Sequence, residues 1–220
     1  MKDDIFKRST TTAAIISDRA YNILIGAVLC WGFWLNWLIV RYIPAESVVG
    51  IDFRLFLLLY FASCFLGIYL FNKSQKPMVS FVGYNLVVVP FGFVINVVVS
   101  RYDSSLVLEA IQITAVVTIS MMIVGTIFPA FFRAIARVLF FSLLFVIIFE
   151  LVGLFFFHRP EIPWIDWTVA IIFCGYIGLD WGRANQIPKT VDNAIDSAAA
   201  IYMDIINLFL RILRILGRKK

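Results

Sequence analysis

Two aspartates stand in apolar sequence near the end of the chain, where a charged side chain is least expected. Asp180 and Asp204 are 24 positions apart in a chain of 220 residues. If these stretches lie in a membrane, each ionised group costs at least about 2.5 to 3.5 kcal/mol, so both are functional-site candidates by default. Two carboxyl groups in contact at low dielectric do not both ionise easily, so one keeps its proton and hydrogen-bonds to the other. The pair therefore predicts a site that responds to protons.

A divalent cation is the second partner that this pair predicts. When both carboxylates ionise they repel each other, and Ca²⁺, which prefers several carboxylate and carbonyl oxygens, can offset that repulsion. Asp180 and Asp204 are accordingly our tentative calcium site. The predicted chemistry is that of a latch, which protons close and which calcium or high pH loosens.

Other polar residues are predicted to support the pair. In a helix over the last apolar stretch, Asp196 and Arg211 fall near the stripe of Asp204, and Asn207 follows about one turn later on the same side. The supporting candidates are Asp196, Asn207, Arg211, Glu150, Glu109 and Arg183. Two interpretations stay open: a polar cavity, or a structural ion pair of Asp204 with Arg211 or Arg183.

Seven apolar stretches have to position these residues. The chain is 62% hydrophobic and 15% charged, whereas a soluble domain is about half apolar and about a quarter charged. Cutting at clusters of charges and prolines leaves stretches of about 20 residues, enough to cross a hydrocarbon core about 30 Å thick. They cover Tyr21–Ile43, Val49–Phe71, Met78–Ser100, Ser105–Phe128, Val138–Phe157, Trp164–Trp181 and Asn193–Leu213. The sequence therefore predicts an all-α membrane protein, a bundle of seven hydrophobic helices with a polar last helix at its centre.

The last two stretches are predicted to form a helical hairpin. Pro188 ends the sixth helix, and Asp192 or Asn193 can cap the start of the seventh. At 1.5 Å per residue, Asp180 and Asp204 lie roughly 10 and 18 Å from this turn, so contact is feasible if the helices tilt.

The predicted organisation is one membrane domain over residues 21–213, with a cytoplasmic N-terminal segment at 1–20 and a basic tail at 214–220. The first apolar stretch lacks a small-residue cleavage site, so no signal peptide is predicted. Seven full spans would divide the positive residues almost evenly between the two sides. A last helix that folds back places 15 of the 19 lysines and arginines inside, as the positive-inside rule favours. Whether the last helix spans or re-enters stays open.

Several functional classes are excluded by residue types. Cys30, Cys64 and Cys174 have unrelated spacings within apolar stretches, which excludes a disulfide framework and a thiolate zinc site. His158 is the single histidine and lies in a loop, so the histidine motifs of metalloproteases and serine proteases are absent. Much of the net charge of +5 comes from the C-terminal end, which favours the lipid bilayer over nucleic acid as a partner. No cofactor is expected besides calcium as a bound or transported ion.

The residues around both aspartates resemble one family of membrane proteins. The run Tyr202-Met203-Asp204-Ile205-Ile206-Asn207-Leu208-Phe209, the arginine-containing end Leu213-Arg214-Ile215-Leu216-Gly217, and Gly178-Leu179-Asp180 upstream are similar to the Bax-inhibitor family. Weaker similarity covers Gly83-Tyr84 and Leu108-Glu109-Ala110. Leu179 stands where the family usually has tyrosine, and Trp181-Gly182-Arg183 replaces a polar stretch that contains glutamine.

This resemblance implies a seven-helix fold with a central last helix. In bacterial members it implies a pH-sensitive calcium leak that an aspartate pair gates, which by motif is Asp180 with Asp204. We therefore expect a multi-pass protein, in the cell membrane if the source is bacterial, that leaks calcium or other cations and is not an enzyme. The alternative is a non-channel protein that modulates membrane proteases, stress signalling or cell-death signalling through membrane protein partners. An intramembrane aspartyl protease is less favoured, because its Gly-x-Gly-Asp and Pro-Ala-Leu sequences are absent.

Overall fold

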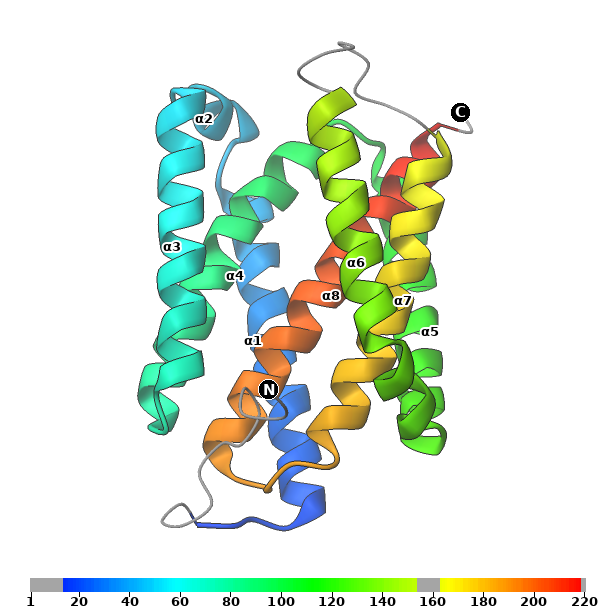
Figure 1. Ribbon diagram of the computed structural model, residues 1–220. Coiled ribbons are helices and arrows are strands. Elements are labelled where there is room, and N and C mark those ends of the chain that lie inside the picture. Colours follow the sequence, from blue (N-terminus) through cyan, green and yellow to red (C-terminus); the bar gives the residue numbers. More distant parts are fainter. Residues whose placement is uncertain (1–13, 154–162, 219–220) are drawn as a thin grey trace. The chain divides into compact units, whose positions relative to one another are not determined.

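The structure is a computed structural model that describes residues 14–153 and 163–218. All regular secondary structure in these ranges is helical, which confirms the predicted all-α class (Figure 1). His158, Lys219 and Lys220 lie outside the described residues. The helices are α1 (Asp18–Tyr42), α2 (Ala45–Val49), α3 (Phe53–Lys73), α4 (Pro77–Val99), α5 (Ser104–Ile127), α6 (Pro129–Val152), α7 (Pro163–Ala184) and α8 (Val191–Gly217).

Five of these helices, α1, α3, α4, α5 and α6, are long and apolar enough to cross a membrane by length and composition. The other two long helices, α7 and α8, have 22 and 27 residues. The seven predicted helices correspond to the long ones, and α2 is a short addition after Pro44. The helices fit an integral multi-pass membrane protein.

Two helices, α6 and α8, extend well past their predicted apolar stretches, because a charged side chain does not by itself end a helix. The helix α6 begins at Pro129, ahead of the stretch that starts at Val138, and its Arg133 and Arg137 are exposed. Proline suits a first helical turn, since its missing N–H has no intrahelical partner there. At the other end, α8 continues to Gly217, so the predicted basic tail begins inside the helix.

The chain groups into two compact units, and α8 contributes to both. The first unit holds residues 1–102 and 186–202, and the second holds residues 103–185 and 203–220. From Asp192 to Gly217, every residue of α8 is buried or half-buried. Its polar residues therefore lie in a protein environment.

In the first unit, α4 packs against both α1 and α3. A Cβ added at Gly67 of α3 would lie 2.5 Å from the carbonyl oxygen of Gly83 in α4, so the two backbones approach closely there. Toward α1, Tyr84 Oη donates a hydrogen bond to Val28 O at 3.0 Å. A hydrogen-bonded contact of this kind fixes one helix against the next where water is absent.

In the second unit, α7 packs against α5 and α6. The backbones of Gly125 in α5 and Gly178 in α7 touch, and a Cβ at Gly178 would overlap the ring of Phe132 in α6. Trp181 Nε1 donates to Thr126 Oγ1 at 2.8 Å. These contacts fix the half of α7 that carries Asp180.

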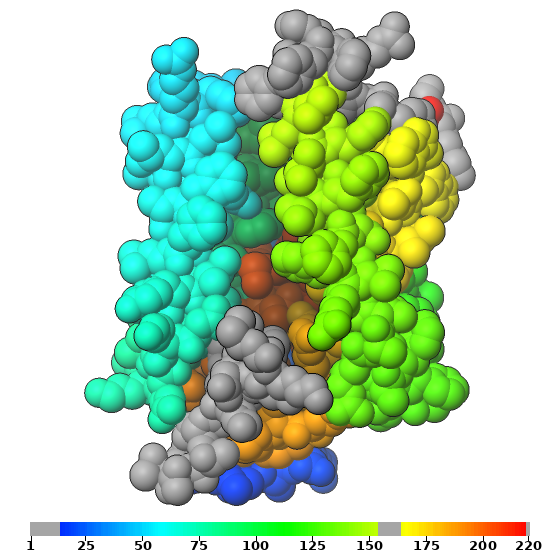
Figure 2. All heavy atoms as spheres, viewed as in Figure 1, coloured from blue at the N-terminus to red at the C-terminus, as the bar shows by residue number. Residues whose placement is uncertain are grey.

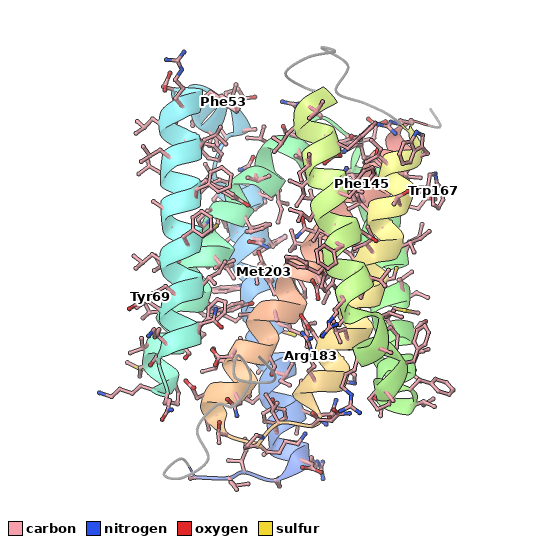
Figure 3. All side chains as sticks on the ribbon, viewed as in Figure 1. Phe53, Tyr69, Phe145, Trp167, Arg183 and Met203 are labelled. Atoms are coloured by element: carbon pink, nitrogen blue, oxygen red, sulfur yellow. The ribbon has the colours of Figure 1, made fainter. Side chains whose placement is uncertain are left out.

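The outer faces of the helices are apolar, as a lipid environment requires. Figure 2 shows the side chains of α3 and α6 at the surface of their units. Phe53 and Tyr69 of α3 and Phe145 of α6 are exposed, and Figure 3 labels all three. Each unit thus presents a broad hydrocarbon-compatible face.

Candidate aspartate-pair site

Asp180 and Asp204 come together in the second unit. Asp180 lies one turn before the end of α7, and Asp204 lies near the middle of α8, next to Met203, which Figure 3 labels. Their side chains are within hydrogen-bonding range of each other. Asp204 is only 7% exposed. A hydrogen bond between two carboxyl groups requires that one of them carries a proton, so the geometry suits a proton-sharing pair.

One oxygen of the pair is left without a donor. Asp204 Oδ2 is buried, and among the described residues no hydrogen-bond donor reaches it. A buried acceptor of this kind costs about 1 to 3 kcal/mol if it stays unsatisfied. A bound proton or a bound cation would satisfy it, and both are the partners that the sequence predicts.

Arg183 is the basic neighbour of the pair. It follows Asp180 by one turn of α7, and its Nη1 lies 3.4 Å from Asp180 Oδ1. It also interacts electrostatically with Asp204. Tyr176, one turn before Asp180, interacts with both carboxyl groups. With both aspartates ionised and Arg183 positive, this group carries a net charge of −1, and one proton makes it neutral.

Arg211 and Glu150 form a different cluster, away from the pair along α8. Arg211 Nη1 and Nη2 donate to Glu150 Oε1 and Oε2 at 2.7 and 3.0 Å, and Nη1 also donates to Asp166 Oδ1 at 2.8 Å. Arg211 is seven positions after Asp204, about 10 Å along the helix. Of the two ion-pair partners left open for Asp204, the structure thus places Arg211 with other carboxylates and Arg183 beside the pair.

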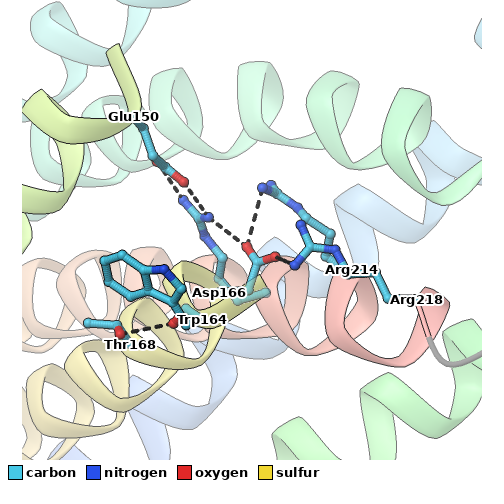
Figure 4. A network of polar contacts seen from close by, with 7 residues as sticks. Glu150, Trp164, Asp166, Thr168, Arg214 and Arg218 are labelled. Carbon is cyan, nitrogen blue, oxygen red and sulfur yellow. Dashed lines mark hydrogen bonds and ion pairs between the residues drawn. The ribbon is translucent and has the colours of Figure 1, made fainter. Parts of the chain in front are cut away.

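Asp166 was not among the predicted site residues, although residue spacing in the antiparallel hairpin of α7 and α8 could have predicted its role. Asp166 precedes Asp180 by 14 positions, and Arg218 follows Asp204 by the same number. Since 14 residues make almost four helical turns, both displacements return to the same helix face. The contact of Asp180 with Asp204 therefore predicts that Asp166 faces Arg218, and their atoms lie 2.8 Å apart (Figure 4).

The remaining candidates lie elsewhere. Asn207 is half-buried and donates to Met203 O in its own helix at 2.8 Å. Asp196 is buried and belongs to the first unit. Glu109 is exposed in the second turn of α5.

The first unit has polar contacts of its own on α8. Tyr21 Oη lies 3.0 Å from Ser197 Oγ, and Ser80 Oγ donates to Asp192 Oδ1 at 2.7 Å. Deeper along the helix, Asn36 Nδ2 donates to Tyr202 Oη at 2.7 Å. These contacts hold the first part of α8 to α1 and α4, while the aspartate pair and the arginine cluster hold the second part to α7 and α6.

For a metal ion, the aspartate pair supplies only part of a coordination shell. No group of three or more His, Cys, Asp or Glu side chains suited to a metal occurs among the described residues. Ca²⁺ takes six to eight oxygen ligands, and two carboxylates offer at most four. The donor set fits a passing or weakly held cation with much of its water rather than a permanent calcium cage.

Comparison with known proteins agrees with the motifs around the two aspartates. A family described as "Inhibitor of apoptosis-promoting Bax1" matches residues 14–220. Protein LIFEGUARD 3 of Arabidopsis thaliana is 28% identical over 77% of this chain and 70% of its own length. Protein LIFEGUARD 4 of the same plant is 32% identical over 66% of this chain and 60% of its own. Bax inhibitor 1 of Schizosaccharomyces pombe is 31% identical over 57% of this chain and 47% of its own length.

These matches have two consequences. The aligned stretches cover 47% to 70% of the relatives' own lengths, so the activities of those whole proteins are not assigned to this chain by the matches. The family match, in contrast, includes every described helix. The chain belongs to the Bax inhibitor family of membrane proteins.

Proposed function

We propose that this protein is a pH-sensitive leak pathway for calcium or related cations, gated by Asp180 and Asp204. The observation that carries the proposal is the contact between the carboxyl groups of Asp180, which is half-buried on α7, and Asp204, which is buried on α8. Carboxyl groups of this kind inside a membrane protein are expensive and mark ion or proton pathways. In a bacterium, the membrane concerned is the cytoplasmic membrane.

The gate works through the charge of the pair. In the closed state one aspartate is protonated and donates to the other, so the pair bridges α7 to α8, and Arg183 balances the single negative charge. When both aspartates ionise, two like charges about 4 Å apart repel by about 4 kcal/mol at an effective dielectric of about 20. That energy changes an equilibrium between closed and open states about a thousandfold, enough to move a closed gate to substantial opening.

Calcium assists this opening. A divalent cation between the ionised carboxylates replaces the proton as the positive partner, and its remaining ligands are water and backbone carbonyl oxygens. Protons and calcium therefore compete for the same oxygens, among them the buried Asp204 Oδ2. Leak increases from acid to alkaline pH.

The test is calcium flux from proteoliposomes that hold the purified full chain. For the wild type, we expect at least about tenfold more flux at about pH 8 than at about pH 6, because ionisation of both aspartates brings two like charges together. Asp180→Asn and Asp204→Asn each keep a hydrogen-bonding side chain but remove the repulsion, so flux should become low and independent of pH. Asp103→Asn, an exposed change at the start of α5, is the matched control.

The result that ends the leak-gate proposal is a pH-dependent flux that both aspartate variants retain. In that case the second candidate, a non-channel membrane protein that modulates membrane proteases or stress and cell-death signalling, takes its place. The observation in its favour is that the matched family is described as an inhibitor of apoptosis-promoting Bax1. Cleavage of a membrane substrate that both variants abolish would instead indicate an aspartyl protease.

A further inference from the structure

Pro90 leaves one carbonyl oxygen of α4 without its helical hydrogen-bond donor. In an α-helix each N–H donates to the carbonyl four residues earlier, and proline has no N–H. Pro90 lies inside α4, so the carbonyl of Leu86 loses its donor. Both residues lie near the middle of a helix that is long and apolar enough to cross a membrane. Water is scarce at that depth, so this carbonyl needs a partner from the protein.

Ser63 of α3 supplies that partner. Its Oγ donates to Leu86 O at 2.7 Å, and Ser63 is the middle residue of α3. Four hydroxyl groups elsewhere in the long helices donate instead to the carbonyl four residues earlier in their own helix, namely those of Thr114, Ser120, Thr126 and Thr168. The Ser63 hydroxyl therefore crosses to the neighbouring helix at the position where Pro90 leaves a carbonyl open.

The helix α3 also contacts α4 on both sides of the proline. Before it, the backbones of Gly67 and Gly83 approach closely, and a side chain at either position would overlap the other helix. After it, the ring centres of Tyr60 and Phe91 are 5.6 Å apart. The hydrogen bond of Ser63 lies between these two contacts. Because its contacts continue past the proline, α3 can hold the two halves of α4 at one angle.

The two halves of α4 hold the ends of different helices. In the first half, Ser80 Oγ donates to Asp192 Oδ1 at the start of α8, at 2.7 Å. In the second half, Asn96 Nδ2 donates to Ile39 O and Ile43 O at the end of α1, at 3.1 and 2.8 Å. A change of angle at the proline therefore moves the start of α8 relative to the end of α1.

We propose that Pro90 is a hinge in α4 and that the hydrogen bond from Ser63 to Leu86 O locks it. Proline is a common cause of helix kinks, because it removes a hydrogen bond and its ring crowds the carbonyl four residues earlier. While Ser63 donates to Leu86 O, α3 and both halves of α4 move together. When the hydroxyl turns to Leu59 O in its own helix, α4 bends and the start of α8 follows its first half. This device lies within the first unit and does not depend on the proposed leak.

The first test is a double-mutant cycle on the unfolding equilibrium of the purified full chain in detergent. Ser63→Ala should lower the folding equilibrium constant about tenfold, because Leu86 O then has no donor. Combined with Pro90→Ala, the same change should have less than about a twofold effect, because the alanine N–H restores the helical bond to Leu86 O. Ser63→Thr keeps the hydroxyl and should stay near the wild type. The matched control is Ser120→Ala on α5, whose hydroxyl donates within its own helix and whose effect should be the same in both backgrounds.

The second test measures the hinge itself. Val82 and Ser100 are exposed positions on either side of the proline. Spin labels at these two positions report the distance across α4 by pulsed electron paramagnetic resonance, with the native cysteines replaced by alanine. The wild type should give one narrow distance and Ser63→Ala a broader distribution. Ser63→Ala with Pro90→Ala should give a narrow distance again, because the continuous helix no longer bends.

Three results overturn the proposal. Equal losses of stability from Ser63→Ala with and without Pro90→Ala would show that the hydroxyl does not replace the donor that proline lacks. A narrow distance that Ser63→Ala leaves unchanged would show that Pro90 is a fixed point of α4 and not a hinge. If Ser63→Ala alone does not fold, Pro90→Ala should restore folding, and a failure to restore it is the third such result.

Discussion

The two ends of α7 contact α8 through clusters of different composition. At one end, Asp180 and Asp204 have a single arginine, Arg183, beside them. At the other end, Asp166 with Glu150 faces three arginines, Arg211, Arg214 and Arg218. Both clusters lie on one face of each helix, four turns or about 21 Å apart. The same pair of helices thus carries one contact between carboxyl groups and one that three arginines surround.

This difference separates a contact that can switch from one that cannot. Carboxyl groups in excess can take up or release a proton, so the Asp180–Asp204 contact changes sign from attraction to repulsion. Arginine keeps its charge at every physiological pH, so the cluster around Asp166 holds its attraction. We infer that the arginine cluster anchors α8 while the aspartate pair moves. The predictions below test each side of this comparison.

The largest effect is expected at the anchor, from Asp166→Asn. Removing this charge leaves three guanidinium groups around a neutral amide, and breaking a buried ion pair on one side costs about 3 to 5 kcal/mol. We expect the lower end of that range, because the arginines are partly exposed. Thermal unfolding in detergent measures it, with Asp103→Asn as control. Equal unfolding temperatures for both variants would show that Asp166 anchors nothing.

A smaller effect is expected at the switch, from Arg183→Gln. The positive charge 3.4 Å from Asp180 favours the ionised pair, so its removal delays ionisation. The pH at which the leak is half-open should therefore rise by about one unit or more, with the flux at high pH unchanged. Proteoliposome flux over a pH series measures this midpoint, and Arg137→Gln on the exposed face of α6 is the control. A midpoint that stays in place, or that falls, would separate Arg183 from the gate.

The sequence alone predicted the helices and one of these two clusters. Long apolar stretches cross a membrane by necessity, so their number and order could be read directly, while the exposed Arg133 and Arg137 hid the true start of α6. The hairpin around Pro188 set Asp180 and Asp204 at similar depth, and the structure brings their carboxyl groups together. Local spacing was sufficient there because one short connection joins the two helices.

Partners from other helices could not be predicted in the same way. Arg211 shares a stripe with Asp204, but its partner Glu150 comes from α6, whose rotation about its own axis the sequence does not define. Glu109 was predicted to support the aspartate pair, but it is exposed, and the sequence does not define which face of α5 packs against the other helices. Asp166 was overlooked because it lies between two interfacial tryptophans and resembles an ordinary charge at a helix start.

The smallest effect is expected outside both clusters, at the connection that leads into α8. Lys189 Nζ lies 4.7 Å from the centre of the Tyr21 ring, and partial burial lowers its pKa from the ordinary 10.5. A lysine whose pKa is lowered on folding destabilises the folded state while it is charged, so stability rises as pH increases from the lowered pKa toward 10.5. Lys189→Met should remove this rise. Near neutral pH it should relieve that destabilisation, and the loss of the cation–π contact should oppose this gain by about 0.5 to 1 kcal/mol. Unfolding temperatures across the alkaline range measure both effects, with Lys73→Met as control.

If the alkaline rise in stability persists in Lys189→Met, another group causes it. If the leak of Lys189→Met keeps its pH midpoint, the pH response belongs to the aspartate pair and not to the start of α8.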